Sequence, residues 1–244
     1  MDGYRISDIG ALLRGNPYPG RGLVIGKTPD GQRACTAYFI MGRSANSRNR
    51  VFALRGGALH TEAFDAAKVE DPSLILYTPL RTQGNHLVVT NGDQTDTICA
   101  ALTAGQTLAD ALRTRTFEPD APNFTPRISG LITFADGDFT YDMSILKSMD
   151  AAGTACARGF FSYASLPGLG HFLHTYACDG DPLPSFQGEP ERVAIPDDMD
   201  TFSHALWDAL DAGNRIALYV RYTDLTSGAY TDRLINKNRT GDAK

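Results

Sequence analysis

The chain has 244 residues and a formal net charge of -5, which argues against a nucleic-acid-binding protein because such proteins usually carry a basic surplus. No apolar run approaches the roughly 18 residues of a membrane helix, and the N-terminus lacks the apolar core of a signal peptide. The 4 cysteines are scattered without metal-ligand spacing, so we expect neither zinc nor disulfides, and a cytoplasmic protein.

The N-terminal part is predicted to form a short helix, a hairpin and a third strand. A weak helical pattern covers residues 1–14 and ends at Gly-Asn-Pro. Residues 22–27 and 33–41 are predicted strands, because a Thr-Pro-Asp-Gly turn joins two apolar runs. A strand is expected over residues 51–54, and residues 56–71 are expected to be irregular or an edge segment.

The loop between the second and third predicted strands is rich in arginine. In it, Arg43, Arg48 and Arg50 are interleaved with Ser44 and Asn49. Guanidinium groups bind phosphate or carboxylate through paired hydrogen bonds, so this loop is a candidate anion site. The alternative interpretation is a solvated loop whose arginines only keep the chain in solution.

A polar turn, Thr-Asn-Gly-Asp at residues 90–93, follows the strand predicted over residues 86–90 and leads into a helical pattern over residues 98–112. A junction of this kind can hold a small polar ligand on backbone N–H groups. The commoner alternative is an Asx turn in which Asp93 or Thr95 caps the helix.

On one side of that turn in the sequence lies a candidate phenol for proton transfer, and on the other lies a loop that can present polar groups. Tyr77 ends a strand predicted over residues 74–77, although a core tyrosine is the commoner fate of such a residue. Glu118 and Arg127 lie in a loop over residues 115–127, which is stiff because its prolines exclude helix and central strand. The alternative for this loop is a surface crossing with solvated charges.

The rest of the chain begins with a second hairpin, over residues 128–146, whose sequence loosely echoes the first. His171 and His174 are three residues apart, so on a strand they point to opposite faces and do not share a metal. The other predicted elements are a strand over 154–162, a Gly-rich turn over 166–171, a strand over 172–177, a Pro-rich loop over 180–186, a helix over 200–212 capped by Asp200 or Thr201, a strand over 216–222 and a frayed tail from 236. Many hairpin strands with two main helices predict one α+β domain over residues 1–244.

Four motifs become specific when their order and spacing are taken together. They are Tyr38, Arg43, Ser44, Asn49 and Arg50; Tyr77 and Arg81; the run over residues 88–98; and Thr-Pro-Arg-Ile at residues 125–128. In this order they resemble the stand-alone, archaeal-type inosine-monophosphate (IMP) cyclohydrolase family, most closely over residues 22–132. Leu-Pro-Gly-Leu-Gly-His and Asp-Pro-Leu-Pro-Ser-Phe, further along, resemble the bacterial branch of that family.

The resemblance implies a fold and a reaction. The fold is a four-layer α-β-β-α sandwich like the N-terminal-nucleophile hydrolases, without a processed nucleophile, and the start Met1-Asp2 agrees with that. The reaction is closure of 5-formamidoimidazole-4-carboxamide ribonucleotide to IMP with release of water, in purine biosynthesis. It needs no metal or organic cofactor. The implied partner is a small purine nucleotide, with no nucleic acid and no membrane, and a homo-oligomer is left open.

The resemblance also implies site residues. The expected catalytic residues are Arg43, Tyr77, Asn91 and Glu118. The expected substrate-binding residues are Ser44, Arg48, Asn49, Arg50, Thr90, Gly92, Asp93, Arg127 and His171. Before Thr-Pro-Arg the chain reads Ala-Pro-Asn-Phe, where the archaeal pattern has an acidic pair and an asparagine, so Glu118 is preferred as the acid.

Two other function classes stay open. One is a purine-nucleotide-binding protein that kept the pocket without the chemistry. The other is an amidohydrolase with an internal nucleophile, for which Cys35 has no nearby histidine or aspartate in the sequence.

Overall fold

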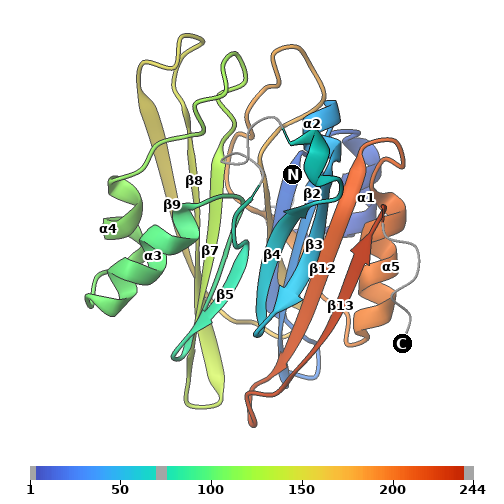
Figure 1. Cartoon of the computed structure of the whole chain (residues 1–244). Helices are drawn as coiled ribbons and strands as arrows, with labels where there is room; N and C mark the ends of the chain where they lie inside the picture. Colours follow the sequence, from blue (N-terminus) through green and yellow to red (C-terminus); the bar gives the residue numbers. More distant parts are fainter. Residues whose placement is uncertain (1–3, 70–75, 239–244) are drawn as a thin grey trace.

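Runs of buried apolar residues form two antiparallel sheets in the computed structural model, which describes residues 4–69 and 76–238 (Figure 1). Within those residues the first sheet contains, in spatial order, β11 (Glu191–Ala194), β10 (Leu169–His174), β1 (Arg21–Lys27), β2 (Arg33–Met41), β12 (Arg215–Asp224) and β13 (Tyr230–Asn236). The second sheet contains β3 (Arg50–Arg55), β4 (Ala58–Ala63), β5 (Leu80–Gln83), β6 (His86–Thr90), β7 (Arg127–Ala135), β8 (Asp138–Ser148) and β9 (Cys156–Ala164).

The inner faces of the two sheets enclose the central core. Leu23 and Ile25 of β1 point into it, as do Leu87 and Val89 of β6, because side chains two residues apart share one face of a strand. All four are fully or almost fully buried. Burying a side chain of this size contributes about 1.5–3 kcal/mol, so this alternation strongly specifies how the strands face each other.

Helices cover the outer faces of both sheets. On the first sheet, α1 (Ile9–Gly15) and α5 (Met199–Ala209) pack over outward-facing residues such as Val24. On the second sheet, α3 (Gln94–Thr103) and α4 (Leu108–Arg113) form a separate apolar cluster, so the two helix pairs lie on opposite sides of the paired sheets (Figure 1). In residues 4–69 and 76–238 no helix is long and apolar enough to cross a membrane.

The predicted α+β class and both predicted hairpins are confirmed. β1 pairs with β2 across a turn in which the N–H of Gly31 donates to the carbonyl oxygen of Thr28 at 2.9 Å. β7 pairs with β8 in the same antiparallel way. The two hairpins lie in different sheets.

The prediction for the segment before the polar turn is wrong in two places. Residues 56–71 were expected to be irregular or an edge, but β4 lies there and pairs with β3 on one side and β5 on the other. Of the strand predicted over residues 74–77, residues 74 and 75 lie outside the described residues, and Leu76 and Tyr77 are not in a strand. The strand is β5, which begins just after Pro79, because pairing with β6 outweighs its weak local pattern.

The helix predicted over residues 98–112 is two helices, α3 and α4. They separate at Gly105, whose φ of 71° lies in the left-handed region that ends helices. Asp93 does stand at the N-cap position of α3, but its side chain makes no capping hydrogen bond. Two shorter helices, α2 (Ala45–Arg48) and the 3₁₀ helix η1 (Ala66–Lys68), lie in the loops around β3 and β4.

The predictions near the chain ends need smaller corrections. The first helix starts at Ile9, where Asp8 accepts a hydrogen bond from the N–H of Ala11 at 2.6 Å. The cap of α5 is Asp198 rather than Asp200 or Thr201. β9 and β10 are shifted from their predicted ranges by two or three residues, and β11 and β13 were not predicted because both are edge strands with weak apolar patterns.

Candidate active site

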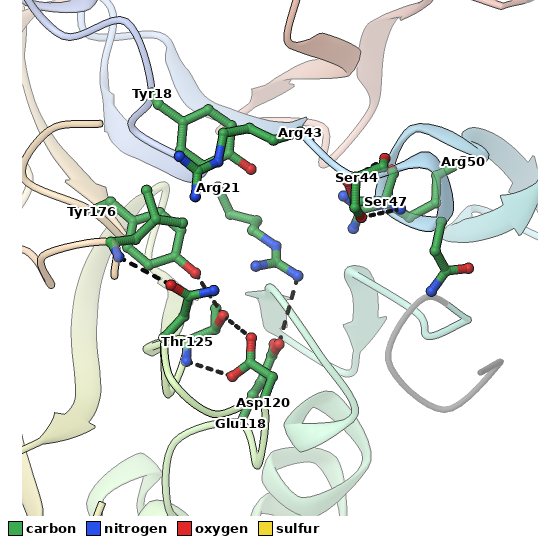
Figure 2. Close-up of a pocket in the computed structure, with 13 residues that line it drawn as sticks. Tyr18, Arg21, Arg43, Ser44, Ser47, Arg50, Glu118, Asp120, Thr125 and Tyr176 are labelled. Atoms are coloured by element: carbon green, nitrogen blue, oxygen red, sulfur yellow. Dashed lines mark hydrogen bonds and ion pairs between the residues drawn. The ribbon is translucent and has the colours of Figure 1, made fainter. Parts of the chain in front are cut away.

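A cavity of about 250 Å³ opens at one end of the paired sheets, where four segments converge (Figure 2). These segments are the start of β1, the arginine-rich loop before β3, the loop over residues 114–126 and the loop after β10. The lining residues are Tyr18, Arg21, Arg43, Ser44, Asn46, Ser47, Arg50, Glu118, Asp120, Asn123, Thr125, Tyr176 and Leu183.

A buried ion pair spans this cavity. Arg21 Nη2 lies 3.6 Å from Glu118 Oε2, and the two side chains are only 13% and 5% exposed. Burial raises the pKa of the Glu118 carboxyl, although Arg21 opposes the shift. Burial lowers the pKa of Arg21, but Glu118 and nearby phenols outweigh this and the net shift is upward. Arg21 is therefore a permanent cation beside a carboxyl that is suited to gain and lose a proton.

Arg50 is the second buried cation of the cavity. Its Nε donates to the carbonyl oxygen of Ser47 at 2.7 Å, and its Nη2 donates to that of Met41 at 3.0 Å. Burial and the charge of Arg21 lower the pKa of Arg50. Among the described residues, Arg50 Nη1 and Arg21 Nε are buried without a hydrogen-bond partner. Because buried donors are normally paired, these two groups indicate a ligand with acceptor oxygens.

Thr125 ties the loop that carries Glu118 to the opposite wall. Its N–H donates to Asp120 Oδ1 at 2.7 Å, and its hydroxyl bonds to Asp120 and, at 2.6 Å, to the Tyr176 hydroxyl. Its carbonyl oxygen accepts from the N–H of Glu118 at 2.9 Å. Burial raises the pKa of Tyr176, so that phenol stays protonated. This network holds the Glu118 backbone in place with few rotatable groups.

A pair of phenols lies behind the two arginines. The hydroxyls of Tyr38 and Tyr77 are 2.9 Å apart, and both rings are buried. Tyr77 is anchored through its backbone, because its N–H donates to Thr61 Oγ1 at 2.8 Å and its carbonyl oxygen accepts from the N–H of Thr61 at 3.0 Å. Burial and the neighbouring Tyr77 raise the pKa of Tyr38. Both phenols act electrostatically on Arg21, but neither Tyr38 nor Tyr77 lines the cavity.

The arginine-rich loop contributes only part of its predicted set to the cavity. Arg43, Ser44 and Arg50 line it. Arg48 does not: its Nε donates to the carbonyl oxygen of Gly42 at 3.1 Å, and its Nη2 bonds to an asparagine of the β12 side. Asn49 is also outside the lining, because both ends of its amide bond to the backbone of Asp65 at 2.8 Å.

The polar turn after β6 uses its side chains within the chain. Asn91 Nδ2 donates to the carbonyl oxygen of Pro126 at 2.8 Å, and Asn91 Oδ1 accepts from the N–H of Ile128 at 2.8 Å and from Gln94. Thr90 Oγ1 bonds to Thr95 Oγ1 at 2.6 Å. These side chains do not line the cavity, although Asn91 holds Pro126 at the end of the loop that carries Glu118.

Arg127 and Asp93 form an ion pair beside that turn. Arg127 Nη1 lies 2.7 Å from Asp93 Oδ1, which also pairs with Arg115 at 2.5 Å. A Cβ at Gly92 would come within 2.5 Å of Arg127 Nη1, so a larger residue there would displace that guanidinium. The charge of Arg127 reaches Glu118 and lowers its pKa slightly against the larger effect of burial. Arg127 therefore affects the cavity through its charge rather than by lining it.

His171 lies in β10, away from the cavity lining. Its Nδ1 is 2.6 Å from the Tyr141 hydroxyl, and its ring stacks on Tyr163 with centroids 3.7 Å apart. Burial, with a smaller effect of Arg192, lowers the pKa of His171 to about 4. His174 faces the other side of the strand against Phe172, as the spacing predicted.

Sequence reasoning missed several lining residues, notably Arg21, Thr125 and Tyr176. Arg21 carried a usable signal, because it is two residues before Leu23 and therefore shares the inner face of β1. Thr125 stands in the Thr-Pro-Arg-Ile motif but was given no role, and it is 51 residues from Tyr176, so no local pattern pairs the two. In the described part of the chain, no three His, Cys, Asp or Glu side chains are grouped closely enough to hold a metal ion.

Comparison with known proteins identifies the family to which this chain belongs. A family model described as IMP cyclohydrolase-like protein matches residues 18–228. The IMP cyclohydrolase of Methanopyrus kandleri is 31% identical over 185 residues, which is 70% of this chain and 89% of the archaeal protein. The matched range includes every residue that lines the cavity, and the chain belongs to the IMP cyclohydrolase-like family.

Proposed function

We propose that this protein is an IMP cyclohydrolase that closes 5-formamidoimidazole-4-carboxamide ribonucleotide to IMP with release of water, in purine biosynthesis. The observation that carries the proposal is the buried Arg21–Glu118 pair in a cavity where Arg21 and Arg50 leave N–H groups unpartnered among the described residues. Membership of the family and the name of the archaeal relative support it.

The chemistry needs a cavity of this kind rather than an external reactant. The carboxamide nitrogen attacks the formyl carbon of the same molecule, so a C–N bond forms within one bound conformer. The formyl oxygen then leaves as water, with one proton from the carboxamide nitrogen and one from the formamide nitrogen. The enzyme must hold the reactive conformer, stabilise negative charge on the formyl oxygen and move these protons.

The residues of the cavity are suited to those tasks. Glu118 accepts the carboxamide proton, because its raised pKa makes the carboxylate a stronger base than an exposed glutamate. Arg21 faces the developing charge on the formyl oxygen with a fixed guanidinium. Tyr77 lies outside the cavity lining, and its hydroxyl, which is hydrogen-bonded to that of Tyr38, is the group assigned to donate a proton to the departing oxygen.

The rim of the cavity is assigned to the 5′-phosphate. Arg43 and Ser44 lie at the more exposed side of the cavity, opposite the Glu118 loop (Figure 2). Arg50 lies deeper and offers its unpartnered Nη1 to a ribose or phosphate oxygen. In this arrangement the base reaches the Arg21–Glu118 pair while the phosphate stays near solvent.

Three broader statements belong to the same proposal. Residues 1–244 form a single domain, which the family match over residues 18–228 supports. The order of helices and sheets is that of the N-terminal-nucleophile hydrolases, without a processed nucleophile, and the helix pairs outside the two sheets support it. The protein works in the cytoplasm on a free nucleotide.

One assay separates the proposed function from its alternatives. The purified protein is incubated with the formylated ribonucleotide, and IMP is followed by absorbance, with the Glu118→Gln variant and a protein-free sample as controls. Formation of IMP by the wild type alone supports the proposal. Binding of IMP without turnover would instead identify a nucleotide-binding protein, and neither binding nor turnover would reject both.

The amidohydrolase alternative finds little support in the cavity. Cys35 is fully buried in β2, does not line the cavity, and burial raises the pKa of its thiol. The hydroxyl of Ser44 instead caps α2, accepting from the N–H of Ser47 at 3.1 Å. Neither residue has the adjacent base that an activated nucleophile requires.

A further inference from the structure

A carboxylate that the proposed reaction does not use holds Arg43 at the mouth of the cavity. Arg43 Nη1 donates to Asp179 Oδ1 at 2.6 Å and to the carbonyl oxygen of Gly180 at 2.9 Å. The guanidinium also lies over the Tyr18 ring, 5.1 Å from its centroid. The side chains of Arg43 and Asp179 are 36% and 46% exposed, so an arriving ligand can reach both.

The loop that carries Asp179 is attached to the cavity at a second point. Leu183, which lines the cavity, donates its N–H to Asn123 Oδ1 at 3.0 Å. Asp179 therefore remains close to Arg43 without depending on the ion pair alone. Its carboxylate occupies the edge of the Arg43 guanidinium where the anionic group of a ligand would bind.

We propose that Asp179 sets the affinity of the cavity mouth for phosphate, because its carboxylate competes with the phosphate of an incoming nucleotide for Arg43. The inference rests on the proposed function and adds the ligand group that the cavity mouth selects. A phosphate carries more negative charge than a carboxylate and has three acceptor oxygens, so it displaces Asp179 from the guanidinium. A nucleoside has no such group and leaves the Arg43–Asp179 pair in place.

Charge in the cavity explains why such a competitor is useful. Arg21 is matched by Glu118, but Arg43 would face the solvent as an unmatched cation without Asp179. A partly exposed ion pair contributes little to folding stability, so the pair costs an incoming phosphate only a small part of its binding free energy. The pair thus lowers the affinity for a phosphate modestly and leaves the binding of a nucleoside unaffected.

The test compares Asp179→Asn with the wild type by calorimetric titration with IMP, ribose 5-phosphate and inosine. We expect Asp179→Asn to bind IMP and ribose 5-phosphate about threefold to tenfold more tightly, and to bind inosine as the wild type does. The matched control is Asp181→Asn, which removes an exposed carboxylate two residues away in the same loop and should change none of the three affinities. In the double variant Arg43→Gln with Asp179→Asn, the gain should disappear.

The other outcomes separate this proposal from the proposed function. Unchanged or weaker binding of both phosphate ligands by Asp179→Asn means that the carboxylate does not compete. An equal gain for inosine means that the pair blocks entry rather than competing with phosphate. If IMP and inosine fail to bind any variant but ribose 5-phosphate still binds Asp179→Asn more tightly, the proposed function fails and the competition stands. If no ligand binds, both are rejected.

Discussion

The cavity and the polar turn after β6 contain the same kinds of side chain. In the turn these side chains find their partners within the chain, whereas the cavity leaves some of them without a partner among the described residues. In the turn, Asn91 and Gln94 bond to each other and to the backbone of β7, and Asp93 neutralises Arg127. In the cavity, Arg21 and Arg50 keep N–H groups that no described residue accepts. Among the described residues of the turn, Arg127 Nε is the one buried donor without a hydrogen-bond partner.

The difference teaches that residue type alone does not mark a site. A buried polar group whose partners lie within the chain stabilises the fold, whereas one that faces open volume without a partner is available to a ligand. The turn thus acts as a support under the Glu118 loop, and the cavity is the place where substrate contacts are expected. Variants on the two sides should therefore separate stability from activity.

The largest effect is expected from Glu118→Gln. Loss of the base should lower kcat by about 100-fold to 10,000-fold in the cyclisation assay. The exposed carboxylate Glu189 supplies the matched control, since Glu189→Gln should leave kcat unchanged. Full activity of Glu118→Gln would move the base to another group.

The same residue predicts a pH dependence. Burial raises the pKa of Glu118 above its ordinary value of 4.5, so the carboxylate form that acts as base is lost as pH falls through that raised pKa. The kcat/KM profile of the wild type should therefore decline on its acid side at a pH above 4.5. A profile that stays flat down to pH 4.5 would show that this carboxylate is not the base.

Tyr77→Phe should lower kcat by about 100-fold with little change in KM, because the lost interaction is made mainly in the transition state. The ring stays, but Tyr38 loses its hydroxyl partner, which costs about 1–2 kcal/mol of unfolding free energy. Tyr222→Phe is the control, since that buried phenol bonds to the carbonyl oxygen of Pro196. If Tyr77→Phe keeps full kcat, the phenol is a core residue only.

Asn91→Ala tests the other side of the comparison. It removes bonds to the backbone of Pro126 and Ile128, so the unfolding free energy should fall by about 2–4 kcal/mol. Denaturant titration measures this loss, and IMP affinity measured below the unfolding transition should change little. Normal stability with lost turnover would instead support the direct substrate contact predicted for Asn91 from the sequence.

His171 should affect stability and its pH dependence rather than ligand binding. Its pKa of about 4 lies below the ordinary 6.5, so between these values the unfolded chain binds a proton that the folded chain does not. This contribution to stability is present above pH 6.5 and is lost as pH falls toward 4. In His171→Gln the decline of Tm over that range should be shallower by a few degrees, and IMP affinity at neutral pH should be unchanged.

Chelation is expected to have the smallest effect. In the described residues no cluster of metal-ligating side chains is present, and the cyclisation draws only on protons and fixed charge. Dialysis against EDTA should leave the rate of IMP formation unchanged. Activity that disappears with EDTA and returns with a divalent ion would contradict the proposed chemistry.

Local sequence determined the elements whose signals lie within a few residues. The Thr-Pro-Asp-Gly turn and its flanking apolar runs specified the β1–β2 hairpin, because turn chemistry and strand alternation agree there. The clustered Arg43, Ser44 and Arg50 and the stiff proline loop with Glu118 were found in the same way, and the structure brings them to one cavity. Short or edge strands such as β5 and β13 were missed, because only their neighbours in the sheet stabilise them.

Only the tertiary structure decided which polar residues face one another. Tyr38 and Tyr77 are 39 residues apart, and Thr125 and Tyr176 are 51 residues apart, so no local pattern pairs them. The pairing of Arg21 with Glu118 depends on how the first sheet packs against the loop after α4. The same packing gave Asn91 partners for its whole amide and left Arg50 with an unpartnered donor. Sequence names the groups that can do chemistry, whereas the packing of distant segments decides which of them remain free to do it.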